Sequence, residues 1–170
     1  MELLLIRHAI AMEREDFAAS ARPDSERPLT DEGRTKMIEA AAGLASVVET
    51  IALLAASPFT RARETADIVA LAFPGVRREE TPALEPDESP ITFARWIAAH
   101  ATAAESGVIA AVGHEPHLGD MAAWLIAGEA DDAISFKKGG ACLIEINETP
   151  RRASGTLRWL LTPGQLRRLG

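Results

Sequence analysis

Short apolar runs recur along the first two thirds of the chain and predict buried strands. Three of them are almost continuously apolar: residues 3–6, 51–56 and 108–112. Runs of this length without alternation are typical of strands that are covered on both faces of a parallel sheet. These three segments are therefore expected to form the centre of a sheet.

Between these runs the apolar positions follow a helical period. Met37, Ala41, Leu44 and Val48 are spaced for one face of a helix, and Thr30 precedes them as a capping residue. Three further helices are expected over residues 61–72, from Ser89-Pro90 onward, and over 117–126. Helices thus alternate with the strands.

The pattern becomes strand-like again near the C-terminus. Residues 134–136, 141–146 and 157–161 are rich in strand-forming residues, and Lys137-Lys138-Gly139-Gly140 has the composition of a turn. This region is expected to add hairpin strands to the sheet.

This order predicts an α/β fold of three layers, with a mostly parallel central sheet and helices on both faces. We expect one domain over residues 1–170, because no linker, repeat or low-complexity segment interrupts the pattern. Ligands bind beyond the carboxyl ends of the strands in such sheets. The long connections 9–29 and 74–90 are candidates for the rim of that site.

Composition narrows the possible partners and compartment. The net charge of −7 and the pI near 5.1 argue against a surface that binds nucleic acid. The only cysteine, Cys142, lies in an apolar run and is expected to be a core thiol in a reducing compartment. No basic leader and no membrane-length apolar run is present, so we expect a cytoplasmic protein without a membrane partner.

Polar residues interrupt the apolar runs at chemically informative places. Arg7-His8 follows the first run, Ser57 to Arg61 follows the second, and Gly113-His114 follows the third. Because parallel strands end at one edge of a sheet, two arginines and two histidines are expected to converge there.

These residue types suit phosphate chemistry. The forked guanidinium groups of Arg7 and Arg61 can each bind two phosphate oxygens, and a helix that begins near Arg61 would add its positive end. A neutral histidine can attack phosphorus, and either His8 or His114 could serve on this argument alone.

The same segments resemble the histidine phosphatase superfamily, which includes phosphoglycerate mutases, and within it the short bacterial phosphohistidine phosphatases. The similar segments are Leu4 to Ala9, Ser57 to Ala66, Val112 to Pro116, and Arg27 to Thr30 with Gly33. Ala9 stands where the wider superfamily usually has glycine. The resemblance implies a phosphoglycerate mutase-like fold. It also implies that His8 is the phosphorylated nucleophile, while Arg7, Arg61 and His114 bind the phosphoryl group.

We therefore expect a phosphohydrolase that needs neither metal nor organic cofactor and acts on phosphohistidine of a partner protein. The alternatives are a phosphatase or mutase that acts on small phosphate esters, and a non-catalytic module that binds phosphorylated ligands. Glu85, and after it Asp87, are candidates for the acid that protonates a leaving group, against a solvated acidic loop as the alternative. A zinc site at His114, Glu115 and His117 is disfavoured, since Pro116 and the three-residue spacing do not match the known motif.

Overall fold

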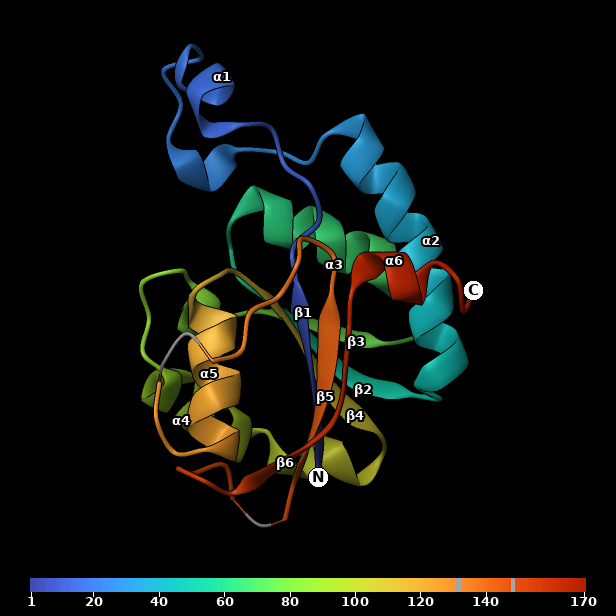
Figure 1. Ribbon diagram of the computed structural model, residues 1–170, viewed down its shortest axis with the longest axis vertical. Helices are drawn as coiled ribbons and strands as arrows, with labels where there is room; N and C mark the ends of the chain where they lie inside the picture. Colours follow the sequence, from blue (N-terminus) through green and yellow to red (C-terminus); the bar gives the residue numbers. More distant parts are fainter. Residues whose placement is uncertain (131–132, 148) are drawn as a thin grey trace.

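A six-stranded mixed sheet forms the middle layer of the molecule, which we describe from a computed structural model (Figure 1). The structure describes residues 1–130, 133–147 and 149–170. The strands lie in the order β3-β2-β4-β1-β5-β6. They are β1 (Glu2–Arg7), β2 (Ile51–Ala56), β3 (Arg77–Glu80), β4 (Val108–Gly113), β5 (Ala141–Ile146) and β6 (Gly155–Leu161).

The first four strands are parallel to one another, and β5 and β6 add an antiparallel hairpin at one side. β1 pairs with β4 in parallel and with β5 in the antiparallel sense, and β5 pairs with β6. The expected three-layer α/β fold with a mostly parallel sheet is thus confirmed.

Helices cover both faces of this sheet, as Figure 1 shows. One face carries α2 (Asp31–Val47), α3 (Thr60–Ala72) and α6 (Pro163–Leu166), and the other carries α4 (Pro90–Ala99) and α5 (His117–Ile126). Along β1, Leu4 and Ile6 face the first group, and Leu3 and Leu5 face the second. This double coverage explains why the run is apolar without alternation.

Helix starts agree with the capping residues in the sequence. The Thr30 hydroxyl accepts a hydrogen bond from the Gly33 amide at 2.9 Å, and Ser89 caps α4 in front of Pro90. Gly33 has a second role, because a Cβ atom there would lie 2.0 Å from the carbonyl oxygen of Ile10. α2 can therefore pack directly against the segment that follows His8.

Two segments differ from the expectations. Residues 134–136 do not form a strand. The Phe136 amide donates to Glu115 Oε1, and the Phe136 carbonyl accepts from Arg7, so both backbone groups bond with side chains and not with another strand. β3 consists of four charged residues that the apolar pattern does not reveal, and it pairs with β2 at the edge of the sheet. Charged edge strands resist pairing with other chains.

The segment between β1 and α2 projects beyond the sheet as a flap, which we define as residues 11–29. It contains the short helix α1 (Arg14–Ala18) and the 3-10 turn η1 (Asp24–Glu26). Two more 3-10 turns, η2 (Pro82–Leu84) and η3 (Ala101–Glu105), lie in the connections between β3 and β4. None of the described helices has the length and hydropathy needed to cross a bilayer.

Candidate active site

The register of the central strands brings the two predicted histidines together. Arg7 pairs with Gly113 across β1 and β4, and the His8 amide donates to the Gly113 carbonyl at 3.0 Å. The residues that follow this pair, His8 and His114, therefore lie side by side. The ring centroids of His8 and His114 lie 5.1 Å apart, and the side chains are only 6% and 2% exposed.

β2 and α3 complete this edge of the sheet. Ser57 follows β2, its amide donates to Val112, and its Oγ lies 2.9 Å from Nε2 of His114. Arg61 lies in the first turn of α3 and is 3% exposed. Thr65, one turn later, accepts a hydrogen bond from the Ala9 amide at 3.0 Å and donates to the Arg61 carbonyl at 2.7 Å. This threonine connects α3 to the segment after the nucleophile candidate.

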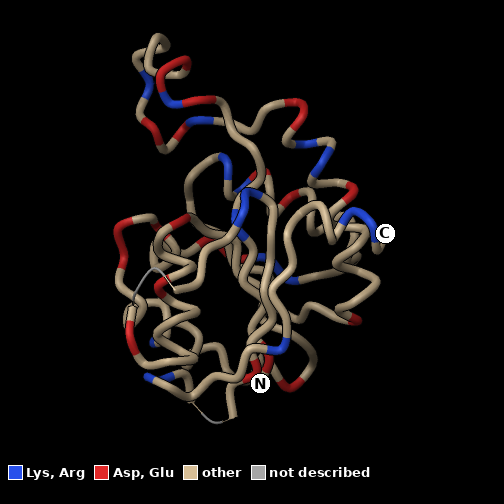
Figure 2. The backbone as a smooth tube through the Cα atoms, viewed as in Figure 1, with Lys and Arg blue, Asp and Glu red and all other residues tan. Residues whose placement is uncertain are grey.

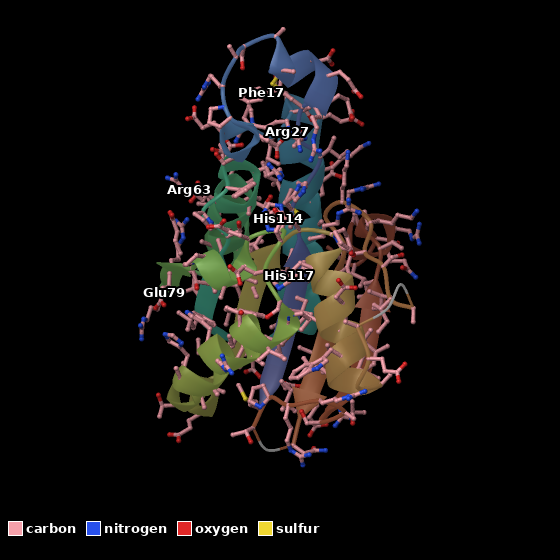
Figure 3. All side chains as sticks on the ribbon, turned by 90° about the vertical axis from the view of Figure 1, so that its left-hand side faces the viewer. Phe17, Arg27, Arg63, Glu79, His114 and His117 are labelled. Atoms are coloured by element: carbon pink, nitrogen blue, oxygen red, sulfur yellow. The ribbon has the colours of Figure 1, made fainter. Side chains whose placement is uncertain are left out.

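A cavity of about 610 Å³ lies at the carboxyl ends of the parallel strands. Its lining residues come from the strand ends, the flap, the connection after β3 and the turn before β5: Arg7, His8, Glu13, Arg14, Asp24, Ser25, Arg27, Phe59, Arg61, Pro86, Asp87, His114, Glu115 and Lys138. Arg7, His8, Arg61 and His114 thus share one cavity, and both long connections contribute to its rim as expected. In Figure 3, His114 lies below the flap that carries Phe17 and Arg27.

The ring of His8 is held in one orientation. Its Nδ1 lies 2.8 Å from the Ala9 carbonyl oxygen, which can only accept, so Nδ1 carries the proton and Nε2 keeps a lone pair. Burial lowers the pKa of His8 to about 3; the bond to Ala9 opposes this shift, and the charges of Arg61, Arg7 and Arg27 reinforce it. The neutral ring is the form that can attack phosphorus.

His114 is also held neutral. Burial lowers its pKa to about 2, and His8 and Arg61 add to the effect. In the absence of a bound anion, the positive charge of the cavity therefore comes from arginine and lysine side chains and not from a protonated His114.

Several buried donors point to an anionic ligand. Nε of Arg7, Nε of Arg61 and Nδ1 of His114 are buried and have no hydrogen-bond partner within the described residues. Leaving such groups unsatisfied is costly, and a bound oxyanion would supply acceptors for them. Burial lowers the pKa values of both arginines, although guanidinium groups remain protonated in proteins.

The flap contributes a carboxylate that the sequence did not single out. Asp24 Oδ2 lies 3.2 Å from Nη1 of Arg61, and Asp24 Oδ1 accepts from Nε of Arg27 at 2.8 Å and lies 3.6 Å from Nε of Arg14. Burial alone would raise the pKa of Asp24, but the bond with Arg27 and the charges of Arg61, Arg27 and Arg14 lower it overall. Asp24 therefore orders a group of arginines at the cavity, and only its place in the folded flap reveals this.

Glu115, which the sequence offers only as part of the disfavoured zinc motif, is a second carboxylate with a structural role at the site. Its Oε1 accepts from the Phe136 amide at 2.5 Å, and the Phe136 carbonyl accepts from Nη1 of Arg7. Glu115 thus fixes the segment that orients Arg7. Burial raises the pKa of Glu115, while the bond to Phe136 and the charge of Arg7 oppose this shift.

The two acid candidates from the sequence differ in their position relative to the cavity. Asp87 lies on the cavity wall and is exposed, whereas Glu85 is not among the lining residues. Of the two candidates, Asp87 therefore has the better position to act on a molecule in the cavity.

The structure also bears on the disfavoured metal site. His117 is buried beside Phe93, with ring centroids 6.3 Å apart, and does not line the cavity. Within residues 1–130, 133–147 and 149–170, no group of at least three His, Cys, Asp or Glu side chains is arranged to hold a metal ion.

Comparisons with known proteins identify the family of the chain. Residues 3–86 match the histidine phosphatase superfamily (branch 1). An uncharacterized protein of Picosynechococcus sp. is 34% identical over 140 residues, which cover 82% of each chain. The protein histidine phosphatase SixA in complex with tungstate is 25% identical, with a TM-score of 0.78 over 98% of this chain and 99% of that one.

A more distant likeness supports the fold. A mycobacterial glucosyl-3-phosphoglycerate phosphatase is 16% identical, with a TM-score of 0.68 over 94% of this chain and 96% of that chain. The sequence match and the similar structures lead to one conclusion: the chain belongs to the histidine phosphatase superfamily.

Proposed function

We propose that the protein is a phosphohistidine phosphatase that works through a covalent phosphohistidine at His8. One observation carries the proposal: a neutral His8, with its proton on Nδ1, shares a cavity with Arg7, Arg61 and His114. Phosphoryl transfer needs little covalent assistance beyond the nucleophile, so orientation and positive charge account for most of the catalysis.

In the first step, the lone pair of His8 Nε2 forms a bond to phosphorus, and the bond from phosphorus to the leaving group breaks. Arg7 and Arg61 donate hydrogen bonds to the oxygens of the transferring group. When the Ser57 hydroxyl donates to Nε2 of His114, the proton of that ring lies on the buried Nδ1. Nδ1 can then donate a hydrogen bond to an oxygen of the phosphoryl group. Water then attacks phosphorus, the bond to His8 breaks, and inorganic phosphate leaves.

The carboxylates of the cavity favour a phosphorus–nitrogen bond as the substrate. Glu13 and Asp87 are exposed at the rim, and Glu13 lies 3.7 Å from Lys138. Asp24 is paired with arginines, and Glu115 is bonded to the Phe136 amide. None of these groups is an evident donor for an alkoxide, which leaves poorly unless it is protonated in the transition state. An imidazole leaving group, with a pKa of about 6.5, can be protonated before the bond breaks.

The likeness to SixA supports the same substrate class, because that relative is described as a protein histidine phosphatase. Fold similarity alone does not assign a substrate. A phosphatase of small phosphate esters is the second candidate, and Asp87 favours it, because a rim carboxylate could reach a small leaving group.

The test compares kcat/KM for a phosphohistidine-bearing protein with kcat/KM for sugar, glycerate and nucleotide phosphates under one set of conditions. We expect the phosphoprotein to be turned over most efficiently. Equal efficiency with any small ester would overturn the preference and favour the second candidate. Failure to hydrolyse any of these substrates or a chromogenic phosphate ester would favour a module that only binds phosphorylated ligands.

A further inference from the structure

A second, smaller cavity of about 120 Å³ begins directly after the nucleophile candidate, since Ala9 and Ile10 form part of its wall. α2, the turn before β5 and the region of α6 supply the remaining lining residues: Gly33, Lys36, Met37, Ala40, Lys138, Gly139, Pro163 and Arg167. We call this space the side cavity. The mechanism proposed above does not use it.

The side cavity is cationic in an acidic protein. Lys36, Lys138 and Arg167 line it, no carboxylate is among the lining residues, and the net charge of the chain is −7. Figure 2 shows lysine and arginine positions on α2, on the turn before β5 and at the C-terminal end. Met37, Ala40 and Pro163 supply an apolar part of the wall.

Carboxylates outside the cavity pair with these three cations. Lys36 pairs with Glu32, Arg167 lies 3.4 Å from Glu39, and Lys138 lies 3.7 Å from Glu13. The side chains of the three cations are 30–43% exposed. Partly exposed ion pairs are weak, so an entering anion can compete with them.

The side cavity and the catalytic cavity share part of their wall. Lys138 lines both of them. The following amide, that of Gly139, donates to the carbonyl oxygens of Arg7 and His8 at 3.2 and 3.1 Å. The turn that presents Lys138 is therefore fixed to the strand end that carries the nucleophile candidate.

We propose that the side cavity binds a second anionic group of the substrate molecule whose phosphoryl group enters the catalytic cavity. This inference rests on the proposed function: for a phosphorylated protein, the group is an acidic side chain near the phosphohistidine. A small phosphate ester that also carries a carboxylate presents the same chemistry, and the experiment separates these two sources.

The test uses phosphohistidine peptides in which one glutamate is moved position by position along both flanks, each paired with a glutamine version. At the position that reaches the side cavity, Arg167→Gln should lower kcat/KM for the glutamate peptide about fivefold, a change typical of one partly exposed charge pair. Lys36→Gln should act in the same direction. The glutamine peptide should be little affected.

Two control variants separate binding from folding. Arg168→Gln changes the neighbouring exposed arginine, which does not line the cavity, and should leave both peptides unaffected. Glu39→Gln removes the carboxylate that competes for Arg167 and should raise kcat/KM for the glutamate peptide. Equal rates for every glutamate and glutamine pair, or an equal loss for both with Arg167→Gln, would overturn the subsite.

An experiment with small molecules tests the subsite independently of the proposed protein substrate. Carboxyphenyl phosphate and phenyl phosphate differ by one carboxylate, and calorimetry on the His8→Ala variant measures their binding without turnover. If Arg167→Gln weakens the binding of carboxyphenyl phosphate and no peptide is turned over, the subsite is supported and the protein substrate is refuted. If Arg167→Gln affects neither carboxyphenyl phosphate nor the glutamate peptides, the subsite is refuted whatever the substrate.

Discussion

His114 Nε2 lies 2.9 Å from Ser57 Oγ, and both side chains are almost fully buried at the carboxyl edge of the sheet. This contact joins the ends of β2 and β4 and fixes the ring of His114. Ser57 does not line the catalytic cavity, so it is a positioning residue that acts through His114.

Ser57→Ala should lower kcat/KM about tenfold, because the hydrogen bond that orients His114 is lost and its buried nitrogen is left without a partner. The pH dependence of kcat/KM in Ser57→Ala should also differ from that of the wild type, because the ring of His114 can then rotate and take up a proton more easily. Ser106→Ala is the control: Ser106 is exposed, donates to the Ala103 carbonyl and does not line the catalytic cavity, so this variant should retain activity. Unchanged activity and pH profile in Ser57→Ala would show that the contact has no catalytic role.

Arg61→Ala should lower kcat by about 10²–10³-fold, since a preorganised donor to the transferring group is removed. Arg63 lies on the same helix, is exposed and pairs with Glu80 at 3.0 Å, so Arg63→Ala should stay near the wild-type rate. Steady-state kinetics on both variants, with melting temperatures as a check of folding, measures the difference. Similar losses in the two variants would indicate a general effect on α3.

His8 and His114 should remain neutral well below the usual pKa of histidine, because burial lowers their pKa values to about 3 and about 2. Nitrogen NMR of the labelled, anion-free protein should show neither ring taking up a proton between pH 8 and pH 5. In the unfolded chain both would be protonated near pH 6.5, so the unfolded state binds more protons and stability should fall as the pH drops below that value. A titration midpoint near 6.5 for either ring would contradict the proposed nucleophile state.

Activity should survive exhaustive chelation, because Arg7, Arg27 and Arg61 already supply positive charge to the catalytic cavity. The measurement is turnover after prolonged treatment with a chelator and removal of the complexes. Loss of activity that zinc or magnesium restores would instead support a metal site that involves His114, Glu115 and His117.

The convergence of Arg7, His8, Arg61 and His114 could be predicted from the sequence because the signal is local. Each of these residues follows directly after an apolar run or begins the next helix, and parallel strands end at one edge. The roles of Asp24 and Glu115 could not be predicted in this way. Both depend on contacts made by segments that fold back over the strand ends.

The strand assignment from the sequence differs from the structure in two places, and both differences have physical reasons as well. β3 has no apolar pattern, since it lies at an edge where charged side chains reach solvent, and pairing with β2 alone makes it a strand. Residues 134–136 have strand-forming composition, but the polar groups of Phe136 bond with Glu115 and Arg7 and not with a neighbouring strand. Tertiary contacts overrode local preference in both places.

The central claim is that His8 is phosphorylated during turnover. Rapid quenching of the enzyme with a ³²P-labelled substrate tests this claim most directly. The wild-type protein should carry label that is labile in acid and stable in base, as expected of phosphohistidine, and His8→Ala should carry none and turn over no substrate. Label that persists in His8→Ala, or wild-type label that is stable in acid, would contradict the account.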